Sequence, residues 1–216
     1  MNKLKTLLRV LVTTHKWLPV LRIIPYANLF RELPQAKVNG SKVTFPYGGK
    51  NIVIDFGNWK PALGEIFARE KYLDFLSGDE ISGREVVDIG ASFGETAIFF
   101  ASHGAKKVYA IEPVRSMYNL MVENLRPYSA VPIRAAIGNT DLENIFHAGI
   151  LEELDAPKIT LKELSDEYRF KDAILKLDCE GCETDILVNS DTDTLRRFQY
   201  IVLEYHYGFI QIEHKL

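Results

Sequence analysis

The sequence predicts an α/β fold, in which a doubly wound sheet follows an N-terminal helical and hairpin extension. Two observations carry this prediction. A strand, a glycine turn and a helix follow one another within Glu85 to Gly104, and later apolar runs end in acidic residues. At 216 residues, with 47% hydrophobic and 25% charged residues, the chain is long enough for one complete domain plus an extension. We expect the extension over residues 1–80 and the main domain over residues 81–216.

The first 31 residues are basic and amphipathic. Six Lys and Arg residues precede the first acidic residue, Glu32, and are interleaved with aliphatic and aromatic ones. Arg9 and Lys16 interrupt the apolar runs, which are shorter than the ~20 residues that span a bilayer and lack a signal-peptide pattern. Three roles stay open for residues 1–31: a helical cap on the core, an element for substrate binding or homo-oligomer formation, and peripheral contact with a membrane surface.

The rest of the extension predicts a hairpin and a helix. Lys42 to Phe45 and Asn51 to Phe56 are two short strand-like runs around the turn Pro46 to Gly49. From Asn58 to Leu76, apolar residues fall mostly at three- and four-residue spacing, which predicts a single helix that ends at Ser77-Gly78.

The segment from Glu85 to Gly104 predicts a ligand site. An apolar strand ends near Asp88, Gly90 and Gly94 bracket a turn, and Thr96 to Ala101 continues as a helix. Glycines at the carboxyl end of a strand let a ligand approach the backbone, and a helix start offers unpaired N–H groups. The spacing lacks the G-x-G-x-x-G of dinucleotide sites, so it favours a nucleoside as the ligand over a pyrophosphate.

The next apolar run, Lys107 to Pro113, adds an acidic residue. Glu112 lies about 24 residues beyond Asp88, where a carboxylate can accept hydrogen bonds from both hydroxyls of a ribose. The alternative is that Glu112 is one of the carboxylates that any α/β domain has at strand ends. Together with the glycine turn, it favours nucleoside binding.

Three further elements follow. Val114 to Leu125 is a second helix that Pro127 ends, Val131 to Gly138 is a third strand, and Leu161 to Tyr168 is a short helix. Residues 140–160 show no clear pattern.

Two late apolar runs carry the acid–base candidates. Ala173 to Gly181 ends in Asp178 and Glu180, and Tyr200 to Gly208 ends in Glu204 and His206. Strand alternation would point the members of each pair to the same face, at the edge where the glycine turn lies. Carboxylates and a histidine at one edge of a sheet could act as a general base or hold a divalent metal, and these groups suit either role. The alternative is that they are structural; Glu183, at the start of a helix over Thr184 to Val188, would be favoured there by the helix dipole.

Cys179 and Cys182 form a C-x-x-C. A zinc site draws four ligands, and no second Cys or His pair has matching spacing. We therefore interpret the pair as incidental, and two cysteines without a signal peptide favour a reducing, cytoplasmic setting.

Four motifs in order resemble one family. The run DIGASFGETAIFFASHGAKKVYAIEP looks like the cofactor core of S-adenosylmethionine-dependent methyltransferases, and within them the FkbM family. Two later runs, ILKLDCEGCETDIL and IVLEYH, resemble the K-x-D-x-E-G-x-E and E-x-H runs of that family. The resemblance covers Tyr72 to about Gly208. It implies a Rossmann-like sheet of the class I methyltransferase type and methyl transfer, usually to a hydroxyl oxygen of a sugar or small metabolite.

The resemblance also distributes roles over the candidate residues. The residues expected to bind S-adenosylmethionine are Asp88, Gly90, Ala91, Ser92, Gly94, Glu112, Pro113 and Asn139, the last near the adenine. Those expected at the acceptor hydroxyl are Asp178, Glu180, Glu204 and His206, and we assign no metal ligand. Segments before the glycine turn commonly cover the cofactor in this family, so Trp59 and Tyr72 are candidates for that role or for the core.

One departure from the family pattern concerns the end of the chain. Methyltransferases of this fold usually carry a helix and two strands after the fifth strand, whereas only eight residues follow Gly208 here. We expect the C-terminal strands to be missing, through truncation or with another subunit covering the sheet edge.

Charge and motif together leave two classes of function. Residues 1–80 hold 12 basic and 7 acidic residues, and the remainder 14 and 22, so we expect no nucleic-acid partner. The first class is an O-methyltransferase acting on a small molecule or glycan. The second is a non-catalytic nucleoside-binding or scaffold module, and a nicotinamide oxidoreductase is disfavoured by the glycine spacing.

Overall fold

A computed structural model describes residues 27–57, 63–138, 144–147, 150–153 and 155–204. The chain divides into two compact units, Met1–Phe75 and Leu76–Leu216. Among the described residues, no helix is long and apolar enough to cross a membrane.

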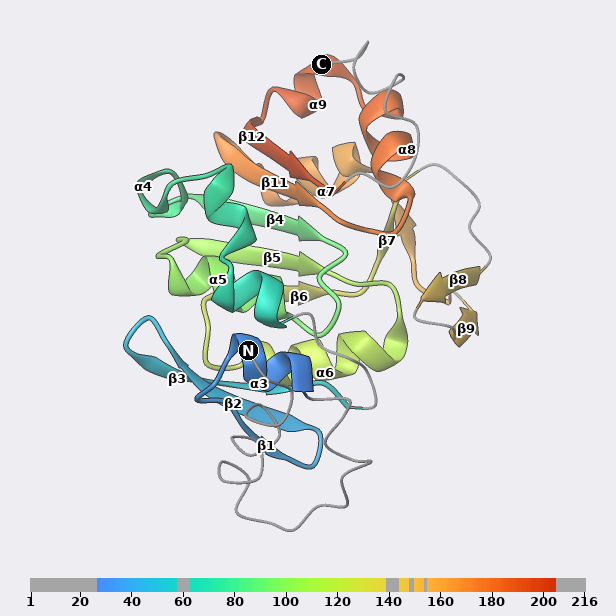
Figure 1. The fold of residues 1–216 in the computed structure, drawn as a ribbon. Coiled ribbons are helices and arrows are strands. Elements are labelled where there is room, and N and C mark those ends of the chain that lie inside the picture. The colour runs from blue at the N-terminus through green and yellow to red at the C-terminus, as the bar shows by residue number, and fades with distance from the viewer. Residues whose placement is uncertain (1–26, 58–62, 139–143, 148–149, 154, 205–216) are drawn as a thin grey trace. The chain divides into compact units, whose positions relative to one another are not determined.

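The first unit contains a three-stranded antiparallel sheet, coloured blue in Figure 1. Its described elements begin with α3 (Ala27–Glu32), β1 (Lys37–Asn39), β2 (Lys42–Tyr47) and β3 (Lys50–Asp55). Alternate residues of β2 and β3 are buried, with Phe45 opposite Ile52 and Val43 opposite Ile54. The hairpin prediction is therefore confirmed.

The single helix expected over residues 58–76 is wrong. Within the described part of that stretch, the chain forms a π-helical turn, η2 (Gly64–Ala68), and a 3₁₀ turn, η3 (Lys71–Asp74). Glu70 separates them with a left-handed φ of 52°, and its Oε1 accepts a hydrogen bond of 2.7 Å from the Tyr47 hydroxyl. This tertiary contact with β2 overrides the local helical pattern.

The structure also places Tyr72 and Ser77. Tyr72 is a core residue, 5% exposed, whereas Trp59 lies outside the described residues. Ser77 begins a helix instead of ending one: its hydroxyl accepts from the Glu80 amide, and the Glu80 carboxylate accepts from the Ser77 amide, in a capping box on α4 (Gly78–Ile81).

The second unit is built on a parallel sheet whose strands lie side by side in Figure 1. Its order is β12-β11-β4-β5-β6. The strands are β4 (Glu85–Ile89), β5 (Lys107–Ile111), β6 (Ala130–Ile133), β11 (Ala173–Leu177) and β12 (Phe198–Leu203). The chain runs outward from β4 to β5 and β6 and returns on the other side at β11. The predicted doubly wound sheet is confirmed, and its switch point, where such folds bind ligands, lies between β4 and β11.

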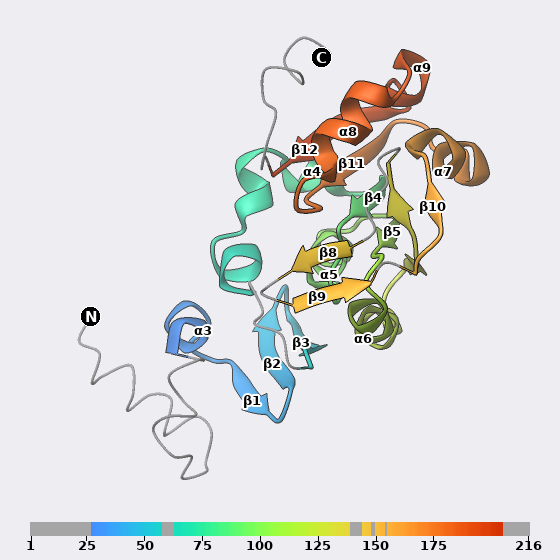
Figure 2. The ribbon, with the colours of Figure 1, turned by 90° about the vertical axis from the view of Figure 1, so that its right-hand side faces the viewer.

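Helices cover both faces of this sheet (Figure 2). They are α5 (Glu95–Ser102), α6 (Arg115–Leu125), α7 (Leu161–Tyr168), α8 (Cys182–Asn189) and the short α9 (Thr192–Leu195). On one face, Val87, Ile89 and Leu175 belong to a buried cluster with Leu164 of α7 and Ile186 of α8. The alternate residues of β4 and β11 face the other way, and Asp88 and Lys176 are among them.

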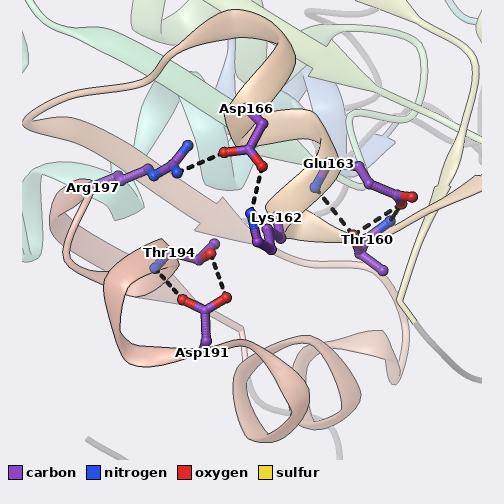
Figure 3. Close-up of polar contacts among 7 residues, drawn as sticks. All are labelled: Thr160, Lys162, Glu163, Asp166, Asp191, Thr194 and Arg197. Carbon is purple, nitrogen blue, oxygen red and sulfur yellow. Dashed lines mark hydrogen bonds and ion pairs between the residues drawn. The ribbon is translucent and has the colours of Figure 1, made fainter.

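Figure 3 shows polar contacts of α7, of α9 and of Arg197, which directly precedes β12. The Asp166 carboxylate accepts from Lys162 at 2.5 Å and from Arg197 at 2.6 Å, and these bonds lower its pKa. Side chains cap both helices, with Thr160 and Glu163 forming a capping box on α7 and Asp191 accepting from Thr194 on α9.

The predicted third strand divides in two. After β6, the chain forms β7 (Ala136–Ile137), which pairs with β10 (Lys158–Ile159) outside the five-stranded sheet. Between them, the stretch without a clear sequence pattern contains an antiparallel pair, β8 (Asn144–His147) and β9 (Ile150–Glu153). Strands this short offer too few alternations for the sequence to reveal them.

Candidate functional site

The turn after β4 needs glycine at its first position. Gly90 has a φ of +79°, and a Cβ there would collide with the backbone carbonyl oxygen of Asp178. The amides of Gly90 and Ala91 donate to the carbonyl of Ile111 at 3.1 and 2.9 Å. The end of β4 is therefore fixed between the ends of β5 and β11, at the switch point of the sheet.

The same turn leads into α5. Ser92 has a left-handed φ of 51°, and Gly94, with φ 93°, is the N-cap residue of the helix. This conformation aims the Ser92 amide at the Glu112 carboxylate, with Ser92 N and Glu112 Oε2 2.9 Å apart. The turn and the carboxylate after β5 are thus one hydrogen-bonded unit.

Glu112 is a buried carboxylate, 5% exposed, directly after β5. Its Oε1 accepts from the Val114 amide at 2.8 Å, while its Oε2 accepts from Ser92. Burial raises the pKa of Glu112 to about 7, although both amides favour the charged form. A carboxylate has about four acceptor positions, so two remain for a ligand.

A pocket with an empty volume of about 380 Å³ lies at this edge of the sheet. Its walls come from the turn after β4, the end of β5, the start of α6 and the loop after β11. The lining residues are Gly90, Ser92, Glu112, Pro113, Val114, Met117, Asp178, Cys179 and Glu180. Of these described lining residues, three are acidic and none is basic, so the pocket favours a ligand with positive charge.

A buried lysine contacts the glycine turn that forms part of the pocket wall. Lys176, 1% exposed, places its Nζ 2.9 Å from the Gly90 carbonyl oxygen and 2.9 Å from Asp88 Oδ1. Asp88 is fully buried, and within the described residues neither of its oxygens has a well-aligned hydrogen bond. The charge of Asp88 therefore depends on its ion pair with Lys176.

Glu95, the first residue of α5, is a second buried carboxyl near this pair. Burial raises its pKa to about 8, although its own amide and the Lys176 charge oppose that shift. Asp88 and Glu112 raise the pKa of Glu95 further through charge repulsion. Neither Glu95 nor Lys176 is among the predicted site residues. The sequence does not show which charged side chains are buried together at the end of a strand.

The loop after β11 departs from strand geometry. β11 ends at Leu177, and Glu180 adopts a left-handed φ of 58°, so the expectation that strand alternation aligns Asp178 with Glu180 is wrong. Both residues nevertheless line the pocket. The buried Glu183 carboxylate holds the loop, because its oxygens accept from the Cys179 amide at 2.8 Å and the Gly181 amide at 3.0 Å.

The interpretation of the cysteines as incidental is also wrong. The structure joins Cys179 and Cys182 in a disulfide. Cys179 lines the pocket, and Cys182 is the first residue of α8. The spacing of two cysteines along the chain does not by itself place their sulfur atoms in contact.

The structure brings together some predicted site residues and not others. Gly90, Ser92, Glu112, Pro113, Asp178 and Glu180 line one pocket. Four others do not line it. Asp88 and Ala91 are fully buried, and Gly94 is the N-cap residue of α5. Glu204 is exposed and follows β12, and its amide donates a hydrogen bond of 2.9 Å to the Leu177 carbonyl. Asn139 and His206 lie outside the described residues.

A second pocket, with an empty volume of about 420 Å³, lies beside α8. It is lined by Ala136, Ile137, Gly138, Lys158, Gly181, Cys182 and Asp185. It shares the loop after β11 with the first pocket. For metals, the described part of the chain contains no group of three or more His, Cys, Asp or Glu residues arranged to hold an ion.

One family profile matches the part of the chain that contains this pocket. The family profile described as the methyltransferase FkbM domain matches residues 88–215, more than half of the chain. That range includes the glycine turn, Glu112 and the loop after β11. No curated protein matches the chain significantly.

Three solved structures that are similar to the chain have low sequence identity to it. A SAM-dependent methyltransferase from Agrobacterium tumefaciens is 12% identical over 82% of this chain and 57% of its own, with a TM-score of 0.45. The T. thermophilus 16S rRNA N2 G1207 methyltransferase RsmC, in complex with AdoMet and guanosine, is 15% identical over 81% and 45%, with a TM-score of 0.47. Trm5b from Pyrococcus abyssi is 19% identical over 47% and 34%, with a TM-score of 0.33. The chain thus spans between about a third and three fifths of these proteins.

Proposed function

Because the chain belongs to the FkbM methyltransferase family, we propose that it binds S-adenosylmethionine in the pocket between Gly90 and Glu112 and methylates a hydroxyl oxygen of a small molecule or glycan. The observation that carries the proposal is the Glu112 carboxylate, buried at the pocket wall with both oxygens held by backbone amides. Its remaining acceptor positions suit the two hydroxyls of a ribose.

The charge of the pocket also fits this cofactor. S-adenosylmethionine carries a net positive charge, and the lining of the pocket includes Glu112, Asp178 and Glu180 without a basic residue among the described ones. A dinucleotide such as NAD brings negative phosphates, which this lining repels. When bound, S-adenosylmethionine supplies an electrophilic methyl group on a sulfonium sulfur.

The residues of the chain would contribute positioning and proton removal. Gly90 allows close approach to the backbone, and Glu112 would orient the ribose. Asp178 lies at the pocket with its side chain 24% exposed and its Oδ2 4.0 Å from the Lys176 Nζ, and we assign it as the general base for an acceptor hydroxyl. Glu180 shares this pocket, whereas Glu204 lies at the neighbouring strand end and is the candidate for contacts with the acceptor.

The acceptor class remains a choice between two kinds of molecule. The acidic second half of the chain and the acidic pocket favour a neutral hydroxyl compound or glycan. RsmC is described as an rRNA methyltransferase, so we keep a nucleic acid as the second kind of acceptor. The acceptor screen therefore includes RNA.

Cofactor binding is tested by calorimetry of S-adenosylmethionine, S-adenosylhomocysteine and NAD. We expect the two adenosyl sulfur compounds to bind and NAD not to bind. Glu112→Gln should weaken binding about tenfold or more, since a hydrogen bond to a charged group contributes about 1.5–3 kcal/mol. Glu123→Gln, on the exposed face of α6, is the matched control and should leave affinity unchanged.

Turnover is tested with methyl-labelled S-adenosylmethionine against sugars, small hydroxyl compounds and RNA. Asp178→Asn should keep affinity for S-adenosylhomocysteine and lower methyl transfer at least about 100-fold, as expected for loss of a general base. Binding without transfer to any acceptor would favour the scaffold alternative. Unchanged turnover in Asp178→Asn would refute the role assigned to Asp178.

A further inference from the structure

The disulfide between Cys179 and Cys182 lies at the junction of the two pockets. Cys179 lines the pocket that contains Glu112, and Cys182 lines the pocket beside α8. Two candidate site residues, Asp178 and Glu180, flank Cys179 in the same loop. A change in the bonding of these sulfur atoms therefore acts directly on the walls of both pockets.

Besides this bond, the buried Glu183 side chain holds the backbone of the loop. Glu183 is 1% exposed and accepts hydrogen bonds from the amides of Cys179 and Gly181. The bond joins residues only three positions apart, and a ring this short constrains the unfolded chain less than a longer loop would. The bond is thus poorly suited to act as a structural staple.

The positions of the two sulfur atoms suit thiol–disulfide exchange. Cys179 is partly exposed, whereas Cys182 is 9% exposed and begins α8. An incoming thiolate reaches the more exposed sulfur, and the dipole at the start of α8 favours the leaving thiolate of Cys182.

We propose that Cys179 and Cys182 form a reversible thiol–disulfide exchange site for low-molecular-weight thiols and disulfides, and that its oxidation state sets ligand affinity in the adjoining pocket. The effect on affinity rests on the proposed function, whereas the exchange chemistry does not.

The exchange is balanced in two steps. A small thiolate attacks the Cys179 sulfur, which forms a mixed disulfide as the bond to Cys182 breaks and Cys182 leaves as a thiolate. A second small thiolate attacks the small-molecule sulfur of that mixed disulfide, releasing the Cys179 thiolate and one small disulfide. Two electrons pass to the protein from two thiols, and oxidation is the reverse reaction.

Reduction must change the loop because two thiols cannot lie as close together as two bonded sulfur atoms. Cys179 and Cys182 then separate, while Glu183 still holds the backbone amides. The displacement falls on the side chains of Cys179 and Cys182, which line the two pockets. We expect weaker binding in the reduced form, because fewer wall atoms are held in place before the ligand arrives.

The test uses the full chain, equilibrated over a series of ratios of reduced to oxidised glutathione. Alkylation of free thiols followed by mass spectrometry counts the dithiol and disulfide forms. Calorimetry then measures S-adenosylhomocysteine binding at the two ends of the series. We expect both cysteines to titrate together and the reduced form to bind about fivefold or more weakly, at the lower end of typical coupling between sites.

The double variant Cys179→Ser, Cys182→Ser is the control and should bind with one affinity at both ends of the series. A pair that stays bonded or stays reduced throughout overturns the exchange site. Equal affinity of both forms overturns the coupling to the pocket. Absence of binding in either form refutes the proposed function, and the thiol titration, which needs no ligand, still decides whether the exchange site exists.

Discussion

Replacing Lys176 with Met tests whether the buried ion pair supports the glycine turn. Methionine keeps the length and apolar stem of the side chain but removes the ammonium that lies 2.9 Å from both Asp88 Oδ1 and the Gly90 carbonyl. Because Asp88 is fully buried, the substitution leaves an uncompensated charge in the core. Removing one partner of a buried pair costs about 3–5 kcal/mol, so we expect a loss of that size in the free energy of unfolding.

Urea denaturation measures this loss, with circular dichroism and tyrosine fluorescence as probes. Lys162→Met is the matched control, because Lys162 forms an ion pair with Asp166 in which both side chains are about half exposed. Its substitution should cost less than about 1 kcal/mol. S-adenosylhomocysteine affinity should fall in Lys176→Met but not in Lys162→Met, since only Lys176 contacts the turn.

A double-mutant cycle with Asp88→Asn separates the ion pair from general packing. The combined substitution removes both charges and should cost less than the sum of the two single substitutions. Additive costs in the cycle, or equal costs for Lys176→Met and Lys162→Met, would show that the pair does not support the turn.

Three further outcomes follow from the same geometry. Burial raises the pKa of Glu95 to about 8 from 4.5, so the native state holds an extra proton between these values; stability should therefore fall as pH rises through that window, and less so in Glu95→Gln, as thermal unfolding at pH 5 and pH 8 would show. Gly90→Ala should destabilise more than Gly83→Ala, since the two share a φ near +78° (+79° and +76°) but only Gly90 has a backbone atom where the Cβ would lie; equal costs in urea would contradict the predicted collision. Thr160→Ala should cost about 0.5–2 kcal/mol by removing the cap of α7, and an unchanged urea midpoint would argue against that cap.

The glycine turn shows how far local sequence carries the site. Gly90 and Glu112 are recognisable because each follows directly on an apolar strand, and parallel strands bring their carboxyl ends to one edge. The same logic finds Asp178. It fails for the relation between Asp178 and Glu180, because strand alternation no longer applies once β11 ends at Leu177.

The helix expected before Ser77 fails for a different reason. Its apolar spacing is helical, but the break between η2 and η3 lies at Glu70. The Glu70 side chain accepts a hydrogen bond from Tyr47, 23 residues earlier in the chain, which holds the break in place. Local periodicity contains no information about a partner so distant in sequence.

The sequence by itself determined the order of the strands in the five-stranded sheet along the chain, the glycine turn and the acidic residue after β5, because each depends on residues that are neighbours along the chain. The tertiary structure alone decided that Lys176 lies beneath Gly90, that Glu183 holds the loop after β11, and that Cys179 meets Cys182 at the pocket wall. These contacts depend on how the backbone turns at the strand ends and on which side chains are buried there. Both follow from packing across the sheet, which no local pattern of residues encodes.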